Sequence, residues 1–320
     1  MTLTRRAVLA AFAAALSMPH MALAADAPLS VVTTTGMIAD AARQVGGDSV
    51  TVKALMGPGI DPHAYRQTRS DIVEMTRADL VLWHGLYLEA QLESLLLDMG
   101  RSRNVIAVGE AVPEALRLAD PDYDNRFDPH VWMDPDLWQY VVLAVRDALS
   151  AARPQQTELF AANAAAHIAA LEGLSEYAAQ SLASVPQEAR VLLTAHDAFG
   201  YFGRAYGYEV LGIQGISTES EAGLNRIGEL VTLLVDRQIG AVFVESSVSD
   251  RNIRALIEGA AARGHTVRVG GELFSDAMGP DGTYEGTYIG MIDHNVTMIA
   301  GALGGDVPPR GLNDQLSAGL

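Results

Sequence analysis

The chain has 320 residues, a formal net charge of -17 at pH 7 and no cysteine. The acidic balance argues against nucleic acid and anionic membranes as partners and favours cations near the surface. Without thiols no disulfide can form, so folding must rely on apolar cores, and the length suits two domains of ordinary size.

Residues 1–24 are predicted to be a signal peptide. Arg5 and Arg6 form a basic start, an alanine-rich apolar run follows, and Ala22-Leu23-Ala24 supplies a cleavage site. The alternative is an N-terminal anchor, but the run is short for a membrane span. We expect a periplasmic chain cleaved near Ala24, with the general and twin-arginine export routes both open. Its net charge would be about -19 after the loss of two arginines. No later cysteine offers a site for a lipid anchor.

Residues 25–153 show short apolar strands alternating with helices, which is typical of a parallel α/β sheet. The strands are predicted at residues 29–33, 49–55, 80–83 and 104–108, and the helices at residues 37–45, 68–77 and 86–97. An acidic loop at residues 120–128 then leads to His130. We interpret this half as an N-terminal lobe with a core of its own.

Residues 154–186 form an alanine-rich stretch without internal proline. Apolar side chains recur at steps of three and four, which is helical spacing. They are Phe160, Ala164, Ile168, Leu171, Leu174, Ala178 and Leu182. A helix of this length spans roughly 45 Å, so we interpret it as a helix linking two lobes. The alternative is an oversized surface helix.

The same alternation returns in residues 187–320, the predicted C-terminal lobe. Its strands are expected at residues 190–194, 209–212, 241–245 and 266–269, and its helices at 223–237, 251–262 and 286–303. The Pro/Gly-rich tail after Gly304 is expected to be loosely held. The predicted fold class is therefore α/β, with two parallel-sheet lobes joined by one long interdomain helix.

Four side chains are candidates for a metal site. The tripeptide Asp-Pro-His occurs twice, ending at His63 and His130, and proline restricts the backbone just before each imidazole. His63, His196 and Asp276 each follow the C-terminal end of a predicted strand, the edge at which open α/β sheets bind ligands. Three imidazoles and one carboxylate suit zinc and are usable by manganese, iron or cobalt, whereas calcium and magnesium prefer oxygen ligands.

Long stretches of the sequence resemble the substrate-binding proteins of zinc/manganese ABC importers, the TroA-like periplasmic receptors. The matching stretches are Gly59–His63, Asp128–Asp134, Thr194–Phe202, Gln214–Thr218 and Gly271–Met278. The resemblance implies two lobes with the metal between them, and a monomer that delivers it to a membrane permease with a cytoplasmic ATPase. Position by position, His63, His130, His196 and Asp276 match the family's four ligands.

The resemblance leaves the metal open between zinc and manganese. Family members that resemble manganese receptors tend to carry glutamate at the position of His196, whereas zinc and dual-metal receptors carry histidine. Many zinc receptors also have a long loop rich in histidine before the second ligand. Here residues 118–127 are short, acidic and without histidine. We therefore expect zinc, with manganese as a possible second cargo.

Five further residues carry predictions of their own, and two of them have two competing interpretations. His84, at a strand end, is expected either to line the cleft or to be exposed. Glu245 is expected to accept a hydrogen bond from an imidazole or to have a structural role at its strand end. His167 is predicted to be a solvated surface residue, His265 a turn residue, and His294 a packed structural side chain.

Two other functions remain as alternatives. A zinc hydrolase would need an open coordination position and a general base. The sequence has no H-E-x-x-H motif, and Asp197 is the obvious candidate base. A metal-binding adhesin is a role that some relatives have acquired, but the absence of a cysteine for a lipid anchor argues against it. We therefore expect a binding protein without catalytic activity.

Overall fold

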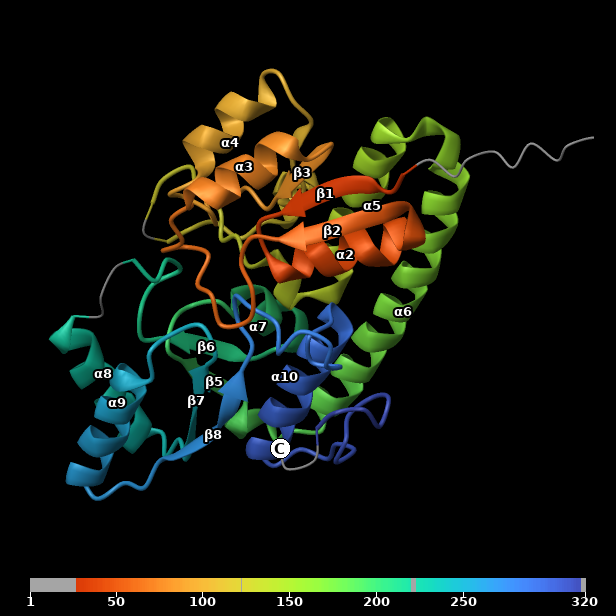
Figure 1. The fold of residues 1–320 in the computed structure, drawn as a ribbon. Coiled ribbons are helices and arrows are strands. Elements are labelled where there is room, and N and C mark those ends of the chain that lie inside the picture. The colour runs from red at the N-terminus through yellow and green to blue at the C-terminus, as the bar shows by residue number, and fades with distance from the viewer. Residues whose placement is uncertain (1–26, 122, 220–222, 318–320) are drawn as a thin grey trace, which may run out of the picture.

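The computed structural model describes residues 27–121, 123–219 and 223–317. The predicted signal peptide and its cleavage site lie outside these residues. Two α/β lobes are joined by one long helix along their side (Figure 1). None of the helices in the described part of the chain is long and apolar enough to span a membrane.

The N-terminal lobe contains a four-stranded parallel sheet in the order β2-β1-β3-β4. Its strands are β1 (Leu29–Thr33), β2 (Val50–Ala54), β3 (Leu80–Trp83) and β4 (Val105–Ala107), and its helices are α2 (Gly36–Gly46), α3 (Arg69–Arg77), α4 (Glu93–Gly100) and α5 (Pro135–Ala152). The predicted alternation is confirmed, with one helix missed, but the helix expected at residues 86–97 begins only at Glu93, because Leu86 and Tyr87 have positive φ. Asp134 caps α5 by accepting the N–H of Asp136 (3.0 Å), and Pro135 occupies the first helical turn, where its missing N–H costs nothing.

The C-terminal lobe contains two parallel strand pairs, β5-β6 and β7-β8. The strands are β5 (Val191–Thr194), β6 (Glu209–Gly212), β7 (Ala241–Glu245) and β8 (Arg268–Leu273), and the helices are α7 (Gly200–Tyr206), α8 (Leu224–Asp236), α9 (Arg251–Ala262) and α10 (Tyr288–Ala302). The tail is not loose as expected. Leu316 is fully buried, and the Leu312 N–H donates to the buried Asp293.

The long helix α6 (Thr157–Ala183) is the predicted link between the lobes, about 40 Å in length. It packs against α2 and α5 of the first lobe and α10 of the second. Its buried face largely follows the predicted spacing, but His167, only 6% exposed, takes the place expected for Ile168. The prediction that His167 is a solvated surface residue is therefore wrong. It lies three residues after Ala164 and four before Leu171, which is the helical step of a buried position.

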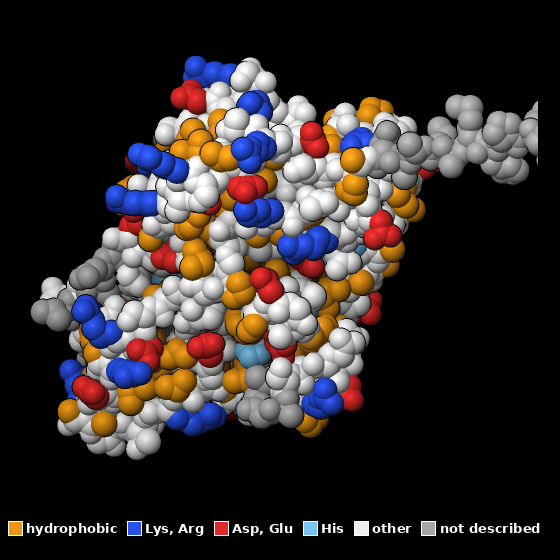
Figure 2. Space-filling view, in the orientation of Figure 1, with side chains coloured by type: hydrophobic (Ala, Val, Ile, Leu, Met, Phe, Trp, Pro, Cys, Tyr) orange, Lys and Arg blue, Asp and Glu red, His pale blue; other side chains and the backbone are white. Residues whose placement is uncertain are grey.

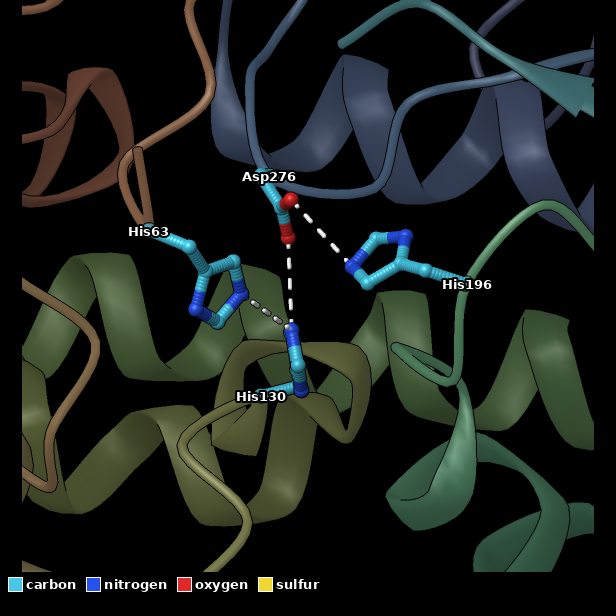
Figure 3. Close-up of side chains that lie close together, drawn as sticks. All are labelled: His63, His130, His196 and Asp276. Atoms are coloured by element: carbon cyan, nitrogen blue, oxygen red, sulfur yellow. Dashed lines mark hydrogen bonds and ion pairs between the residues drawn. The ribbon is translucent and has the colours of Figure 1, made fainter. Parts of the chain in front are cut away.

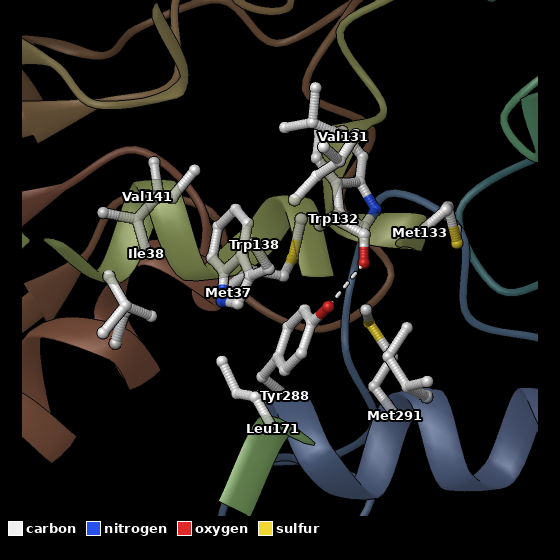
Figure 4. Close-up of a cluster of buried hydrophobic side chains, with 14 of the residues drawn as sticks. Met37, Ile38, Val131, Trp132, Met133, Trp138, Val141, Leu171, Tyr288 and Met291 are labelled. Atoms are coloured by element: carbon white, nitrogen blue, oxygen red, sulfur yellow. Dashed lines mark hydrogen bonds between the residues drawn. The ribbon is translucent and has the colours of Figure 1, made fainter. Parts of the chain in front are cut away.

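One apolar core extends through both lobes, and each lobe also has a smaller buried cluster of its own, so the separate cores that were expected are joined by a shared one. The largest buried cluster contains Ile38 of α2, Trp138 of α5, Leu171 of α6 and Met291 of α10 (Figure 4). The indole of Trp138 stacks on Tyr288 of α10, with ring centroids 5.1 Å apart. Because α2, α5 and α10 all pack on α6, they bury their apolar faces together.

Leu171→Ala should lower the free energy of unfolding by about 2–5 kcal/mol, because it opens a cavity in the shared core. Leu159, on the same helix but 46% exposed, is the matched control, and Leu159→Ala should cost less than about 0.5 kcal/mol. Chemical denaturation followed by circular dichroism measures both. Equal losses for the two variants would contradict the position assigned to this core.

Candidate metal centre

The structure brings together all four predicted site residues at the junction of the lobes. His63 follows β2, His130 precedes α5, His196 follows β5, and Asp276 follows β8. Each side chain is at most 2% exposed. They point toward one another from four separate loops (Figure 3). In the same orientation as Figure 1, Figure 2 shows Lys, Arg, Asp and Glu side chains scattered over this face of the molecule, with apolar side chains between them.

The separations between the four groups match a small coordination site. The His63 and His130 Nε2 atoms are 3.3 Å apart, and Asp276 oxygens lie 3.4 Å from His130 Nε2 and 3.2 Å from His196 Nε2. Ligands placed tetrahedrally at zinc–nitrogen distances are about 3.3 Å apart. One ligand atom from each residue can be chosen so that all four lie within 4.8 Å of one another.

Several of these buried atoms form no hydrogen bond of good geometry among the described residues, although they take part in the ion-pair contacts given above. They include both Asp276 oxygens and the His196 Nε2 atom. A buried polar atom without a partner costs about 1–3 kcal/mol. A cation held between the four side chains would satisfy these atoms, and three nitrogens with one oxygen suit a divalent transition metal.

Buried carboxylates hold two of the three imidazoles. Asp128 Oδ1 lies 2.7 Å from His130 Nδ1, and Glu245 Oε2 lies 2.5 Å from His196 Nδ1. Glu245 also accepts the backbone N–H of His196 (2.9 Å). Both contacts use Nδ1 and leave Nε2 facing the other ligands. A histidine that binds metal usually has such a hydrogen bond from its second ring nitrogen to a carboxylate. For Glu245 the structure thus favours the contact with an imidazole, while the importance of Asp128 was missed.

The two Asp-Pro-His tripeptides form the same local turn. Asp61 Oδ1 accepts the His63 N–H (2.8 Å), and Asp128 Oδ1 accepts the His130 N–H (2.9 Å). Aspartate commonly caps the backbone two residues later in this way. From the sequence, the proline alone was expected to orient each imidazole. The aspartate at the start of each repeat was the signal that could have identified this second role.

The three histidines have different pKa values because their surroundings differ. Burial alone would lower the pKa of each imidazole, but Asp128, helped by Asp276, raises the pKa of His130 to about 9. Glu245 and Asp276 likewise outweigh burial and raise the pKa of His196 well above its usual value. His63 has no such carboxylate on its ring, and burial lowers its pKa to about 3. Despite its burial, the neighbouring imidazoles keep the pKa of Asp276 well below its usual value.

The remaining histidines lie outside this group. His84 is 1% exposed, so the alternative of an exposed side chain is wrong, and its Nε2 lies 2.7 Å from the Pro129 carbonyl, next to His130. His265 lies after α9 with Nε2 2.7 Å from the Ile239 carbonyl. His294 is buried, as predicted, with Nε2 2.8 Å from the Glu272 carbonyl.

Residues 31–302 match the family described as ZnuA, zinc-uptake complex component A, periplasmic. The chain belongs to this family. It is a family of metal-specific substrate-binding proteins of ABC importers, which are receptors that work outside the cytoplasm together with a permease and an ATPase.

Relatives named for two different metals are equally similar to the chain. The manganese-binding lipoprotein MntA of Bacillus subtilis is 47% identical over 279 residues, covering 87% of this chain and 91% of that protein. The zinc-binding protein TroA of Treponema pallidum is 47% identical over 280 residues, covering 88% and 90%. The solved structure of Treponema pallidum TroA superposes with a TM-score of 0.84, covering 86% of this chain and 99% of that one. These likenesses confirm the predicted fold.

In the metal-free protein, His130 should titrate near pH 9 while His63 stays neutral from pH 5 to 9. Because the folded pKa of His130 is raised, its stabilising contribution is complete below about pH 6.5 and disappears as the pH rises through 9. Asp128→Asn should shift this titration to lower pH. Nitrogen-15 NMR of the imidazoles measures the midpoints. A wild-type midpoint near 6.5 would contradict the proposed role of Asp128.

Proposed function

We propose that this chain captures one divalent transition metal ion and delivers it to an ABC importer. His63, His130, His196 and Asp276 are the proposed ligands. The observation that carries this proposal is the convergence of three imidazole nitrogens and a carboxylate, buried and within 4.8 Å of one another. Zinc is the proposed cargo, with manganese as a second cargo.

The donor set supports zinc without excluding manganese. Three nitrogens and one oxygen at tetrahedral spacing are a usual zinc arrangement. Manganese prefers more oxygen and a higher coordination number, which the second oxygen of Asp276 would help to supply. The relatives named for zinc and for manganese are equally identical to this chain, so overall similarity does not separate the two metals.

The chain is further proposed to act as a free periplasmic monomer, with the signal peptide removed near Ala24. Several relatives are named lipoproteins, but this sequence contains no cysteine to which a lipid could be attached. The proposed domains remain 25–153, 154–186 and 187–320. We propose that the chain binds metal without catalysing a reaction. The family is a receptor family, and the comparisons support neither the hydrolase nor the adhesin.

Purified chain should bind one zinc ion, and alanine at any proposed ligand should weaken binding by more than about 100-fold. His130→Ala is the most direct test, because it removes the fully buried imidazole closest to two other ligands. His265→Ala is the matched control, since the His265 ring contacts the Ile239 carbonyl and is not among the four grouped side chains. Isothermal titration calorimetry of untagged protein measures stoichiometry and affinity. Unchanged affinity in His130→Ala would overturn the ligand assignment.

Zinc should also stabilise the folded chain by about 4 kcal/mol at a thousandfold excess over Kd, because the complete site exists only in the folded state. Differential scanning calorimetry should show a higher melting temperature with zinc, and a chelator should reverse the increase. The metal-free chain should keep its helical circular dichroism, since the shared apolar core does not depend on the metal. Loss of helical signal on chelation would contradict this.

Zinc uptake at pH 7.5 should release about two protons, because His130 and His196 hold theirs above neutral pH. Affinity should therefore fall as the pH drops from 8 to 6. His196→Glu should release about one proton fewer and lose zinc affinity relative to manganese. Calorimetry in buffers of different ionisation enthalpy counts the protons. If the variant keeps the wild-type metal preference and proton count, His196 is not a ligand.

A further inference from the structure

The two Asp-Pro-His turns differ in the second contact that each aspartate makes. In the second turn, Asp128 Oδ1 reaches the ring of its own histidine, His130. In the first turn, Asp61 Oδ2 turns away from His63 and accepts the Thr218 hydroxyl hydrogen (2.6 Å). Thr218 belongs to the loop after β6, in the opposite lobe. The same tripeptide thus holds the His130 imidazole from within its own lobe, whereas at His63 it bonds the loop to the opposite lobe.

His63 is therefore the least firmly held of the three imidazoles. Carboxylates contact the Nδ1 atoms of His130 and His196. The ring of His63 instead contacts the other two imidazoles, with its Nε2 3.3 Å from His130 Nε2 and its ring edge-on to His196 at a centroid distance of 5.9 Å. The loop that carries His63 instead touches the second lobe. At Gly59, whose φ of +70° favours glycine, an added Cβ would lie 3.4 Å from the Ser246 carbonyl oxygen.

His63 also borders a route to solvent. Of the four proposed ligands, it alone lines a cavity of about 230 Å³ whose wall includes Tyr87 and Glu219. Asp276 borders a different cavity, in which Arg43 and Lys53 balance the charges of Asp276 and Asp281. The wall beside His63 has two carboxylates, Asp120 and Glu219, and one cation, Arg126, so its charge favours an approaching cation. The loop of Asp276 is also anchored, because the Ser275 carbonyl accepts the Trp132 indole N–H (2.8 Å).

We propose that His63 is the ligand that detaches first when metal leaves, and that the hydrogen bond from Thr218 to Asp61 is a latch that sets the rate of this step. Thr218 is then a positioning residue, which acts on the metal through Asp61 and the His63 turn. A hydroxyl hydrogen bond to a carboxylate is among the stronger neutral–charged contacts. This inference rests on the proposed function, since it describes exchange at the same site.

Thr218→Val removes the hydroxyl while keeping the shape of the side chain. Zinc dissociation, measured by stopped flow with excess chelator, should become about tenfold faster, which corresponds to about 1.4 kcal/mol. Thr218→Ser keeps a hydroxyl and should restore the wild-type rate. Thr218→Ala offers a second loss of the hydroxyl. The melting temperature of the metal-free protein should stay unchanged in all three, which separates a latch from a general structural role.

Gln91→Ala is the matched control, because Gln91 donates another hydrogen bond across the junction, to Glu219 (2.7 Å), at an exposed site. Its dissociation rate should stay within twofold of wild type, because water competes for that contact. Wild-type zinc dissociation in both Thr218→Val and Thr218→Ala would overturn the latch, as would equal acceleration in Gln91→Ala. Failure of the wild-type chain to bind zinc would instead overturn the proposed function.

Discussion

Three imidazoles and one carboxylate lie together with almost no exposure to solvent. The surrounding structure offsets the free-energy cost of burying these four groups. Removing ionisable groups from water is unfavourable unless each is paired. Asp128 and Glu245 pair with His130 and His196 on the side away from the common centre. The ligand atoms that face the common centre have too few hydrogen-bond partners in the protein, and a bound metal ion would supply the missing interactions.

The lobes are joined in two chemically different ways. Behind the site, an apolar core runs from α2 and α5 through α6 to α10, and the Tyr288 hydroxyl donates to the Trp132 carbonyl (2.7 Å) within it. At the loops that carry His63 and follow β6, the lobes are instead joined by single polar contacts, such as that between Thr218 and Asp61. Densely packed cores resist deformation, whereas an isolated polar contact at a loop opens at lower cost. Metal exchange through a loop therefore needs less rearrangement than separation of the lobes.

Periodic apolar patterns predicted most of the fold. The strands and the long helix follow from short apolar runs and from steps of three and four residues. Helices α5 and α7 were both missed. Helix α5 was missed because Asp134-Pro135 was interpreted only as a loop signal, although the same pair can cap and begin a helix. The shared core could not be predicted, because it depends on which helices α6 brings together. His167 was misplaced because its polarity was given more weight than its position on the buried face.

For the site, the four residues could be proposed from their positions after strands and from the family resemblance. The contacts that orient them were harder to predict. Glu245 lies 49 residues from His196 in the sequence, and their contact depends on how β5 and β7 pack. Asp61 and Asp128 begin identical tripeptides, yet only one reaches its own imidazole. That difference depends on the opposite lobe, which no local pattern describes.

X-ray absorption at the zinc edge of the zinc-loaded chain tests the central claim most directly, because it counts the imidazoles on the metal. The proposed ligands should give a shell of nitrogen and oxygen at about 2.0 Å, with the scattering of three imidazoles. In His130→Ala, loaded at high zinc, two imidazoles should remain. A wild-type spectrum with one imidazole or none, or a spectrum unchanged by His130→Ala, would contradict the account.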